Sequence, residues 1–196
     1  LRLFTLLASI FLIVMISFIN PTAKERVLDK TLKQMNLLNE NKQEQEQEYD
    51  GIYIFSIAHT HHYMSAYKMF LDNKILGVGV KNFRNFCKYE KYKISKYSCT
   101  SHPHNTYVQI LSETGIIGFI FLLGVFFYFC KKVIKHLLLR LNGKYYFSDF
   151  EISILSGLAI YLWPIVPTGN VFNNWLTIIM LLNLPFLIWS RKLIKN

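Results

Sequence analysis

Long apolar blocks, rather than an alternation of apolar and polar residues, dominate this chain. Four blocks carry almost no charge: residues 3–19, 115–129, 152–166 and 171–189. A membrane-spanning helix needs about 17 to 25 apolar residues, so we expect the second block to start earlier, near residue 110, and to end at Cys130. Pro164 and Pro167 in the third region predict a kink or a partly re-entrant segment. The pattern predicts an all-α integral membrane protein with about four transmembrane helices.

The positions of lysine and arginine predict how these helices are oriented, because short cytoplasmic segments carry an excess of positive charge. The cations after the second block and in the tail are Lys131, Lys132, Lys135, Arg140, Lys144, Arg191, Lys192 and Lys195. The expected order is a helix at 1–20, an outer loop with short amphipathic helices at 21–109, a helix at 110–130, a cytoplasmic basic turn at 131–151, two helices at 152–190 and a cytoplasmic tail at 191–196. The net charge of +10 comes largely from the inner segments, so it does not indicate nucleic-acid binding.

The first apolar block has two interpretations. Because the chain starts with Leu1 and enters an apolar run almost at once, we expect it to be the carboxy-terminal portion of a larger protein. A secretory signal peptide with Arg2 as its basic flank is the alternative. No small-x-small cleavage site precedes Lys24, which favours a transmembrane helix.

Two parts of the outer loop have a helical pattern. Apolar residues recur at three- or four-residue steps from Val27 to Leu38, which predicts an amphipathic helix that packs on the helix bundle or lies on the bilayer. A second helical stretch is expected at 63–71. Between them, the Gln- and Glu-rich residues 39–50 have the composition of a solvated linker.

The cysteines provide a check on this topology. Cys87 and Cys99 lie in the outer loop, whereas Cys130 lies at the inner end of the second span. In an oxidising compartment Cys87 and Cys99 can pair and stabilise the loop by roughly 3 kcal/mol, while Cys130 stays reduced. The alternative is two unpaired thiols in a reducing compartment.

Three histidines within four residues, His59, His61 and His62, raise the question of a metal site. No Cys, Asp or Glu lies near them in the sequence to complete a set of ligands. We therefore expect no metal, and we interpret these side chains as packing or interfacial residues near the substrate.

Glycines and cations occur together further along the loop. Gly77-x-Gly79 allows a tight turn and close backbone approach, and the following Lys81 and Arg84 could meet an anion at a helix start. The segment lacks the preceding strand and the third glycine of a dinucleotide-binding motif, which excludes dinucleotide binding here.

Residues 101–118 are the most informative part of the chain, because imidazoles directly precede an apolar block. Pro103 suits the first turn of a helix. Asn105, Gln109 and Ser112 would then form one polar stripe, which we expect to line a cavity at the outer leaflet.

Several motifs together resemble the bacterial O-antigen ligase and O-antigen polymerase family of membrane glycosyltransferases. The shared features are, in chain order, Gly77-x-Gly79 followed by Phe83, then His104-Asn105, nine further residues, and Gly115-x-x-Gly118. The resemblance covers roughly residues 59–130 and corresponds to the carboxy-terminal portion of such an enzyme. Gly115 and Gly118 are interpreted as a small-x-x-small pair for helix packing.

The resemblance implies transfer of a glycan from a polyprenyl-pyrophosphate carrier to an acceptor hydroxyl, on lipid A core or on a second lipid-linked glycan, in lipopolysaccharide biosynthesis. It places the protein in the bacterial inner membrane with the long loop in the periplasm, and it implies a metal-independent reaction without a cofactor. His104 is the implied catalytic residue, and a neutral imidazole can act as general base. The family also draws basic residues from an upstream outer loop, so we expect this portion alone to be inactive.

The remaining site residues follow from charge and position. The pyrophosphate needs cations near the bilayer surface, and the candidates are Arg84, Lys81 and Arg26. The candidates for contact with the glycan are Asn105, Gln109, His102 and His62.

Two functions of other classes, a transporter component and a periplasmic ligand sensor, fit the sequence less well. A transporter component would carry ionisable residues within its spans, yet the last block holds only the polar Asn173, Asn174 and Asn183. A periplasmic ligand sensor would need an inward signalling output, for which residues 131–151 leave little room. The sequence does not separate a ligase from a polymerase and does not identify the sugar.

Overall fold

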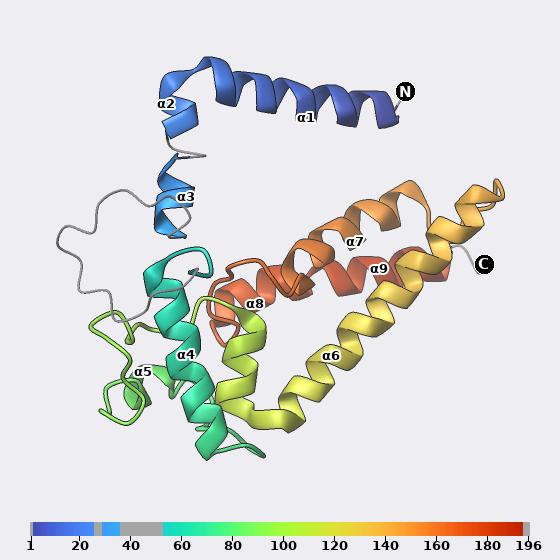
Figure 1. Cartoon of the computed structure of the whole chain (residues 1–196). Coiled ribbons are helices and arrows are strands. Elements are labelled where there is room, and N and C mark those ends of the chain that lie inside the picture. Colours follow the sequence, from blue (N-terminus) through green and yellow to red (C-terminus); the bar gives the residue numbers. More distant parts are fainter. Residues whose placement is uncertain (1, 26–28, 36–52, 194–196) are drawn as a thin grey trace. The chain divides into compact units, whose positions relative to one another are not determined.

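The computed structural model describes residues 2–25, 29–35 and 53–193, and the chain divides into two compact units, residues 1–61 and 62–196. Every regular element in the described part is a helix, as Figure 1 shows, and no strand occurs there. The all-α prediction is therefore confirmed for the described residues.

The described residues of the first unit form three helices and the start of a fourth. They are α1 (Arg2–Ile19), α2 (Pro21–Lys24), α3 (Lys30–Gln34) and the first turn of α4 (Ile57–Asp72). The side chains of α1 are widely exposed, with Phe11 64% and Ile13 63% accessible. Of the amphipathic helix predicted at residues 27–38, α3 covers the middle. Residues 26–28 and 36–52, which include Arg26 and the linker at 39–50, lie outside the described residues.

In the second unit, the polar loop before the long helix is held by a small core and a disulfide. The core joins α4 to α5 (Phe83–Phe86) and the segment that follows, and it consists of Ala66, Met69, Val78, Phe83, Cys87 and Tyr92. The predicted disulfide between Cys87 and Cys99 is present, and Cys130 is a free thiol. This core and the disulfide fix the loop that carries the glycine pair and the cations.

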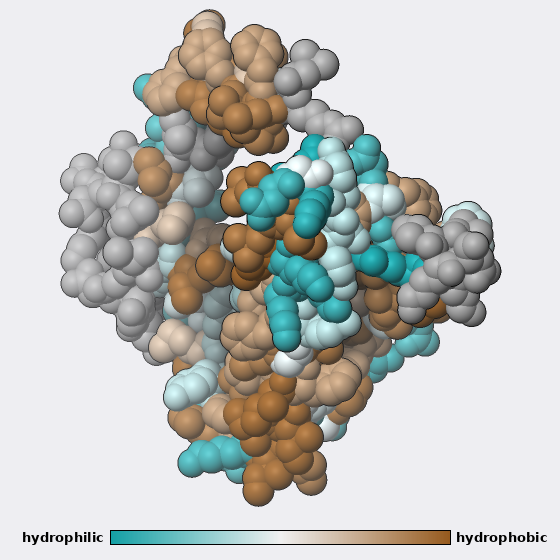
Figure 2. Space-filling model, turned by 90° about the vertical axis from the view of Figure 1, so that its right-hand side faces the viewer, coloured by the Kyte–Doolittle hydropathy of each residue, from teal (hydrophilic) through white to brown (hydrophobic). Residues whose placement is uncertain are grey.

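The long helix α6 (Thr106–Leu141) has 36 residues and is the helix in the described part that is long and apolar enough to cross a membrane. Its outward side chains include Ile117, Ile120 and Phe121, which are 57 to 76% exposed. Figure 2 shows large hydrophobic areas on the face drawn. A soluble monomer rarely exposes so much contiguous apolar surface, so the composition of α6 fits a lipid environment.

The start of α6 differs from the prediction. Asn105 is the residue that caps the helix, because its side-chain oxygen accepts hydrogen bonds from Tyr107 N and Val108 N at 2.9 and 3.1 Å. The helix begins at Thr106, and Pro103 lies before it, not in its first turn. An Asn cap satisfies backbone donors that a first-turn proline would leave unpaired.

Three shorter helices complete the second unit: α7 (Asp149–Leu162), α8 (Asn174–Leu181) and α9 (Asn183–Leu193). The expected interruption near Pro164 is present, because α7 ends at Leu162 and residues 163–173 run without a helix. With 14, 8 and 11 residues, each of these helices is shorter than the roughly 17 residues of a membrane span. The count of four spans stays a prediction.

Candidate functional site

Two backbone segments of the second unit cross in close contact at a kink of α6. Val78 N and Gly79 N donate to Ser112 O and Glu113 O, both at 2.9 Å. A Cβ atom on Gly77 would lie 2.4 Å from the Glu113 carbonyl carbon, and one on Gly115 would lie 2.3 Å from Ile75 O. Only glycine permits this approach.

Gly115 also has φ +68° and ψ −163°, a backbone conformation almost confined to glycine. The close approach predicted at Gly115 therefore exists, but the partner is the turn at residues 74–79 and not a second helix. A Cβ atom on Gly118 would meet Thr114 and Ile110 of the same helix. Gly115 thus approaches a turn and Gly118 faces side chains of its own helix, whereas the two glycines of a helix-packing motif face a second helix.

Glu113 fixes the glycine and cation loop to α6. Its side chain is 1% exposed. One carboxylate oxygen accepts from Phe83 N at 2.8 Å, and the other accepts from Lys81 N at 3.0 Å and Gln109 Nε2 at 3.1 Å. The motifs assign Glu113 no role, although a carboxylate directly before an apolar block is a signal of one.

Lys81 and Arg84 lie on one exposed turn held by Glu113. The Arg84 Nε donates to Lys81 O at 3.3 Å, and Lys81 has φ +62°. Glu113 occupies the N–H groups of Lys81 and Phe83, so an anion at this helix start would meet the side chains of Lys81 and Arg84, and its binding stays a prediction. The two side-chain cations remain at the surface of the turn. The third candidate, Arg26, lies outside the described residues.

Three imidazoles gather directly before α6. The His104 ring lies with its centroid 4.2 Å from that of His102 and 5.5 Å from that of His62, which projects from α4. His104 is half-buried and has φ +59°, a conformation uncommon for a residue other than glycine. Such backbone outliers concentrate at functional sites. Among the described residues, no group of three or more His, Cys, Asp or Glu side chains is arranged to hold a metal ion.

The segment at 163–173 holds the imidazole cluster from the other side. Thr168 N donates to His104 O at 2.9 Å, and the Thr168 and Thr106 hydroxyls lie 2.9 Å apart. Asn105 Nδ2 donates to Pro164 O at 2.8 Å. His104 thus takes its backbone position from contacts with a segment about 60 residues away, which sequence analysis did not connect to the motif.

The predicted polar stripe of α6 is buried against this segment. Gln109 is 0% exposed; its amide donates to Asn170 Oδ1 at 2.8 Å and accepts from Val171 N at 3.1 Å. Ser112 is also fully buried. The stripe therefore packs within the protein and does not line an open cavity. In this structure Asn105 and Gln109 position the backbone around His104, whereas we had expected them to contact the glycan.

His102 is held as a neutral imidazole. Its Nε2 lies 3.3 Å from Thr168 O and its Nδ1 lies 2.8 Å from Ser101 Oγ. Because a carbonyl oxygen only accepts, Nε2 donates its hydrogen and Nδ1 accepts from the serine hydroxyl. Burial lowers the pKa of His102 from its ordinary value of 6.5, against the opposing effect of the Thr168 carbonyl. A neutral neighbour leaves His104 free of like-charge repulsion from this ring at neutral pH.

The lowered pKa of His102 predicts an acid-sensitive fold. As the pH falls, His102 binds a proton in the unfolded chain before it does so in the folded protein. The folding stability linked to the neutral His102 ring is therefore fully present above pH 6.5 and is lost as the pH falls through the folded pKa of His102. We expect the thermal unfolding midpoint to fall on acidification from about pH 7.5 to about pH 5, and to fall less in His102→Gln, which has an amide donor in place of the imidazole and does not titrate. An equal fall in both proteins would contradict this assignment.

Comparison with known proteins adds independent evidence. The family model described as O-antigen ligase matches residues 1–123, which include the glycine turn, the imidazole cluster and the kink of α6. No curated protein and no solved structure shows significant similarity to the chain. The match extends over more than half of the chain and agrees with the motifs around His104. The chain belongs to the O-antigen ligase family, whose members are membrane proteins that transfer glycans.

Proposed function

We propose that the protein transfers a glycan from a polyprenyl-pyrophosphate carrier to an acceptor hydroxyl at the periplasmic face of the bacterial inner membrane. The acceptor is lipid A core in a ligase reaction, or a second lipid-linked glycan in a polymerase reaction. The observation that carries the proposal is the placement of His104, an imidazole in a left-handed backbone conformation next to the start of the apolar helix α6.

His104 acts as the general base in this proposal. The acceptor oxygen attacks the anomeric carbon of the donor glycan, the bond from that carbon to the pyrophosphate oxygen breaks, and the hydroxyl proton passes to the imidazole. No oxidant or reductant is needed. The half-buried ring lies beside those of His62 and His102, and the Thr168 hydrogen bond to the His104 carbonyl holds the backbone that carries the ring. A held base accelerates proton transfer because little reorganisation is required.

Arg84 and Lys81 receive the charge of the leaving pyrophosphate. Their turn is anchored on Glu113, eight residues beyond the capping Asn105, which corresponds to about 12 Å along the axis of α6. The general base and the cations are thus fixed to the same helix. Because the guanidinium offers a planar fork of donors, Arg84 is the principal ligand for the phosphate oxygens.

A reconstituted transfer assay tests the function. Purified full-length protein in lipid vesicles is given a polyprenyl-pyrophosphate-linked glycan and an acceptor, and release of polyprenyl pyrophosphate is followed. Release should depend on the acceptor. We expect Arg84→Gln to lower the rate by about 10- to 100-fold, the loss of one charge-assisted interaction.

Lys88→Gln is the matched control, since Lys88 is an exposed cation of the same loop. It should retain the rate of the native protein. The absence of acceptor-dependent release would contradict the function. An equal loss in the Arg84 and Lys88 variants would contradict the role of Arg84 alone.

A further inference from the structure

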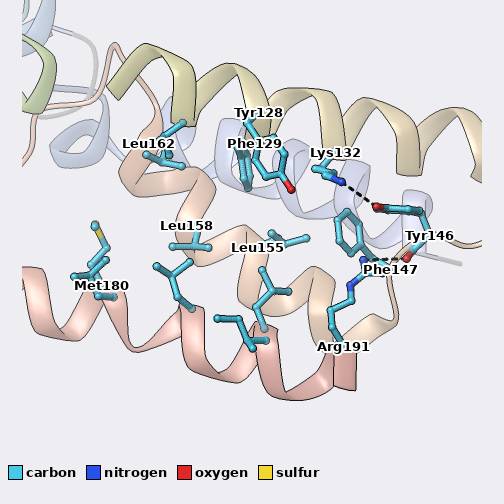
Figure 3. A pocket seen from close by; sticks show the side chains of 15 residues that line it. Tyr128, Phe129, Lys132, Tyr146, Phe147, Leu155, Leu158, Leu162, Met180 and Arg191 are labelled. Atoms are coloured by element: carbon cyan, nitrogen blue, oxygen red, sulfur yellow. Dashed lines mark hydrogen bonds between the residues drawn. The ribbon is translucent and has the colours of Figure 1, made fainter. Parts of the chain in front are cut away.

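A second feature lies in the part of the molecule formed by α6, α7, α8 and α9, away from the imidazole cluster of His62, His102 and His104. A cavity of about 620 Å³ opens between these helices, within the ~300 to 1,000 Å³ of typical ligand sites. Leucine is the commonest residue of its wall, with further apolar and aromatic side chains. Figure 3 shows Leu162 and Met180 at one end of the cavity and Lys132, Tyr146 and Arg191 at the other. The cavity is thus apolar along its length and cationic at one end.

The cationic end is a cage around one aromatic ring. The side-chain charges of Lys132, Lys135 and Arg191 lie 5.5, 4.6 and 4.8 Å from the centre of the Tyr146 ring. Lys132 also donates to the Tyr146 hydroxyl at 3.1 Å. The hydrogen bond from Lys132, together with the charges of Lys135 and Arg191, lowers the pKa of Tyr146 from its ordinary value. Three cations therefore gather on Tyr146; Lys132 and Arg191 line the cavity, and Lys135 lies exposed beside its mouth.

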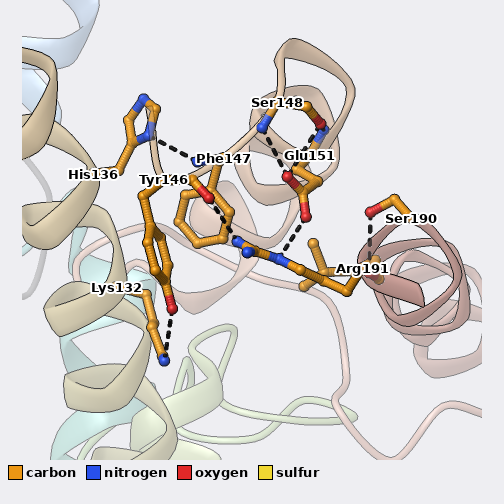
Figure 4. Close-up of polar contacts among 9 residues, drawn as sticks. Lys132, His136, Tyr146, Phe147, Ser148, Glu151, Ser190 and Arg191 are labelled. Atoms are coloured by element: carbon orange, nitrogen blue, oxygen red, sulfur yellow. Dashed lines mark hydrogen bonds and ion pairs between the residues drawn. The ribbon is translucent and has the colours of Figure 1, made fainter. Parts of the chain in front are cut away.

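One carboxylate neutralises a single member of this cage. Glu151 is 0% exposed and forms an ion pair with Arg191, while its other oxygen accepts from Ser148 N at 2.7 Å (Figure 4). Arg191 is thereby fixed in place, and its second nitrogen donates to Tyr146 O at 3.1 Å. The cage keeps two positive charges without a carboxylate partner among its described contacts.

The position of the cage along α6 fits a membrane surface. Lys132 lies 17 residues beyond the kink at Gly115, which corresponds to about 25 Å of helix, against roughly 30 Å for the hydrocarbon layer. The apolar cavity therefore runs alongside the part of α6 suited to the bilayer, and the cage lies where head groups begin.

We propose that this cavity binds an anionic phospholipid, with an acyl chain along the leucine wall and the phosphate in the cage of Lys132, Lys135 and Arg191. Basic pockets between membrane helices accommodate such head groups. A packed helix, from a second copy or elsewhere in the protein, would cover Lys132 at the cavity end without compensating its charge, which is costly. A phosphate neutralises the charges of Lys132 and Lys135, and charge complementarity therefore favours the lipid.

The test measures which lipid the purified full-length protein retains. Protein in detergent is incubated with phosphatidylglycerol or with phosphatidylcholine, and bound lipid is counted by native mass spectrometry. Two excess charges predict a preference of about thirtyfold for phosphatidylglycerol, since each cation near a head group contributes about 1 kcal/mol, or about fivefold. Millimolar inorganic phosphate should not displace the lipid, because it lacks the acyl chain.

Two variants separate the cage from general surface charge. Lys132→Gln with Lys135→Gln should abolish the preference. Lys131→Gln with Lys144→Gln removes the same charge from the same basic segment outside the cage and should preserve it. Arg191 is left intact, because its removal would leave Glu151 buried without its cation. An equal loss of the preference for phosphatidylglycerol in the two double variants would overturn the proposal.

A third variant tests the acyl-chain part of the cavity. Leu184 lines the wall and is 40% exposed, so Leu184→Trp should fill the space and reduce retention of phosphatidylglycerol at least tenfold with the cage intact. Its unfolding temperature, compared with that of the native protein, verifies that it folds. Equal retention of the two lipids by the native protein would overturn the proposal. A lipid-free dimer that Leu184→Trp dissociates would also overturn it, because a second copy would then occupy the cavity.

Discussion

Replacing His104 by Asn should lower the rate of glycan transfer by about 10²- to 10⁴-fold while the protein stays folded. The substitution removes the imidazole that accepts the acceptor proton. It preserves the backbone, because asparagine tolerates the left-handed conformation that His104 adopts at φ +59°. The Thr168 hydrogen bond to the carbonyl of residue 104 is independent of the side chain and should persist. The loss should therefore appear in catalysis and not in stability.

The measurement combines the reconstituted transfer assay with the length of surface polysaccharide on a gel, in cells that carry the variant as their only copy. His59→Asn is the matched control, since His59 is a half-buried histidine whose ring bonds to Ser56 in the first turn of α4. The His59→Asn variant should give the same distribution of surface polysaccharide lengths on the gel as the native protein. A native ladder and rate with Asn at position 104 would refute the role of His104 as general base.

Replacing Gly115 by Ala should destabilise the protein by about 3 kcal/mol or more, and the same change at Gly77 should act similarly. Two costs combine at Gly115. The backbone at φ +68° and ψ −163° is strained for any residue with a Cβ atom. The new methyl group would also lie 2.3 Å from Ile75 O, a backbone atom that cannot rotate away. Relief requires separation of the turn at 74–79 from α6, which would also release the turn that carries Lys81 and Arg84.

Gly124→Ala is the control on the same helix. A Cβ atom there would meet no atom within 4 Å, and alanine is the better helix former by about 1 kcal/mol, so this variant should be as stable as the native protein or more so. Thermal unfolding in detergent and the yield of folded protein measure both changes. Similar unfolding temperatures for the Gly115 and Gly124 variants would contradict the close approach described at the kink.

The sequence predicted several parts of this structure correctly, because local signals carried them. A long charge-free block predicted the apolar helix that the structure forms as α6, and Pro164 predicted the break after α7. The pairing of Cys87 with Cys99 was the expected outcome for two thiols in a loop that is predicted to face an oxidising compartment. The motif around His104 also identified the family.

The start of α6 and the roles of its polar residues were predicted less well. Pro103 predicted the start of the helix, whereas the cap formed by the Asn105 side chain sets the start at Thr106. Gln109 lies on a polar stripe, which sequence alone cannot distinguish from a water-facing surface. Its burial depends on Asn170 and Val171, whose approach the helical period does not encode.

By itself, the sequence determined the helical class, the apolar blocks and the presence of a histidine motif, because each depends on neighbouring residues or on composition. Only the tertiary structure decided that Glu113 holds the turn of Lys81 and Phe83, and that the segment around Thr168 fixes His104. These hydrogen bonds join residues 30 to 66 positions apart, and many use backbone atoms that every residue possesses. Residue identity therefore cannot specify them, and the folded chain alone brings the partners together.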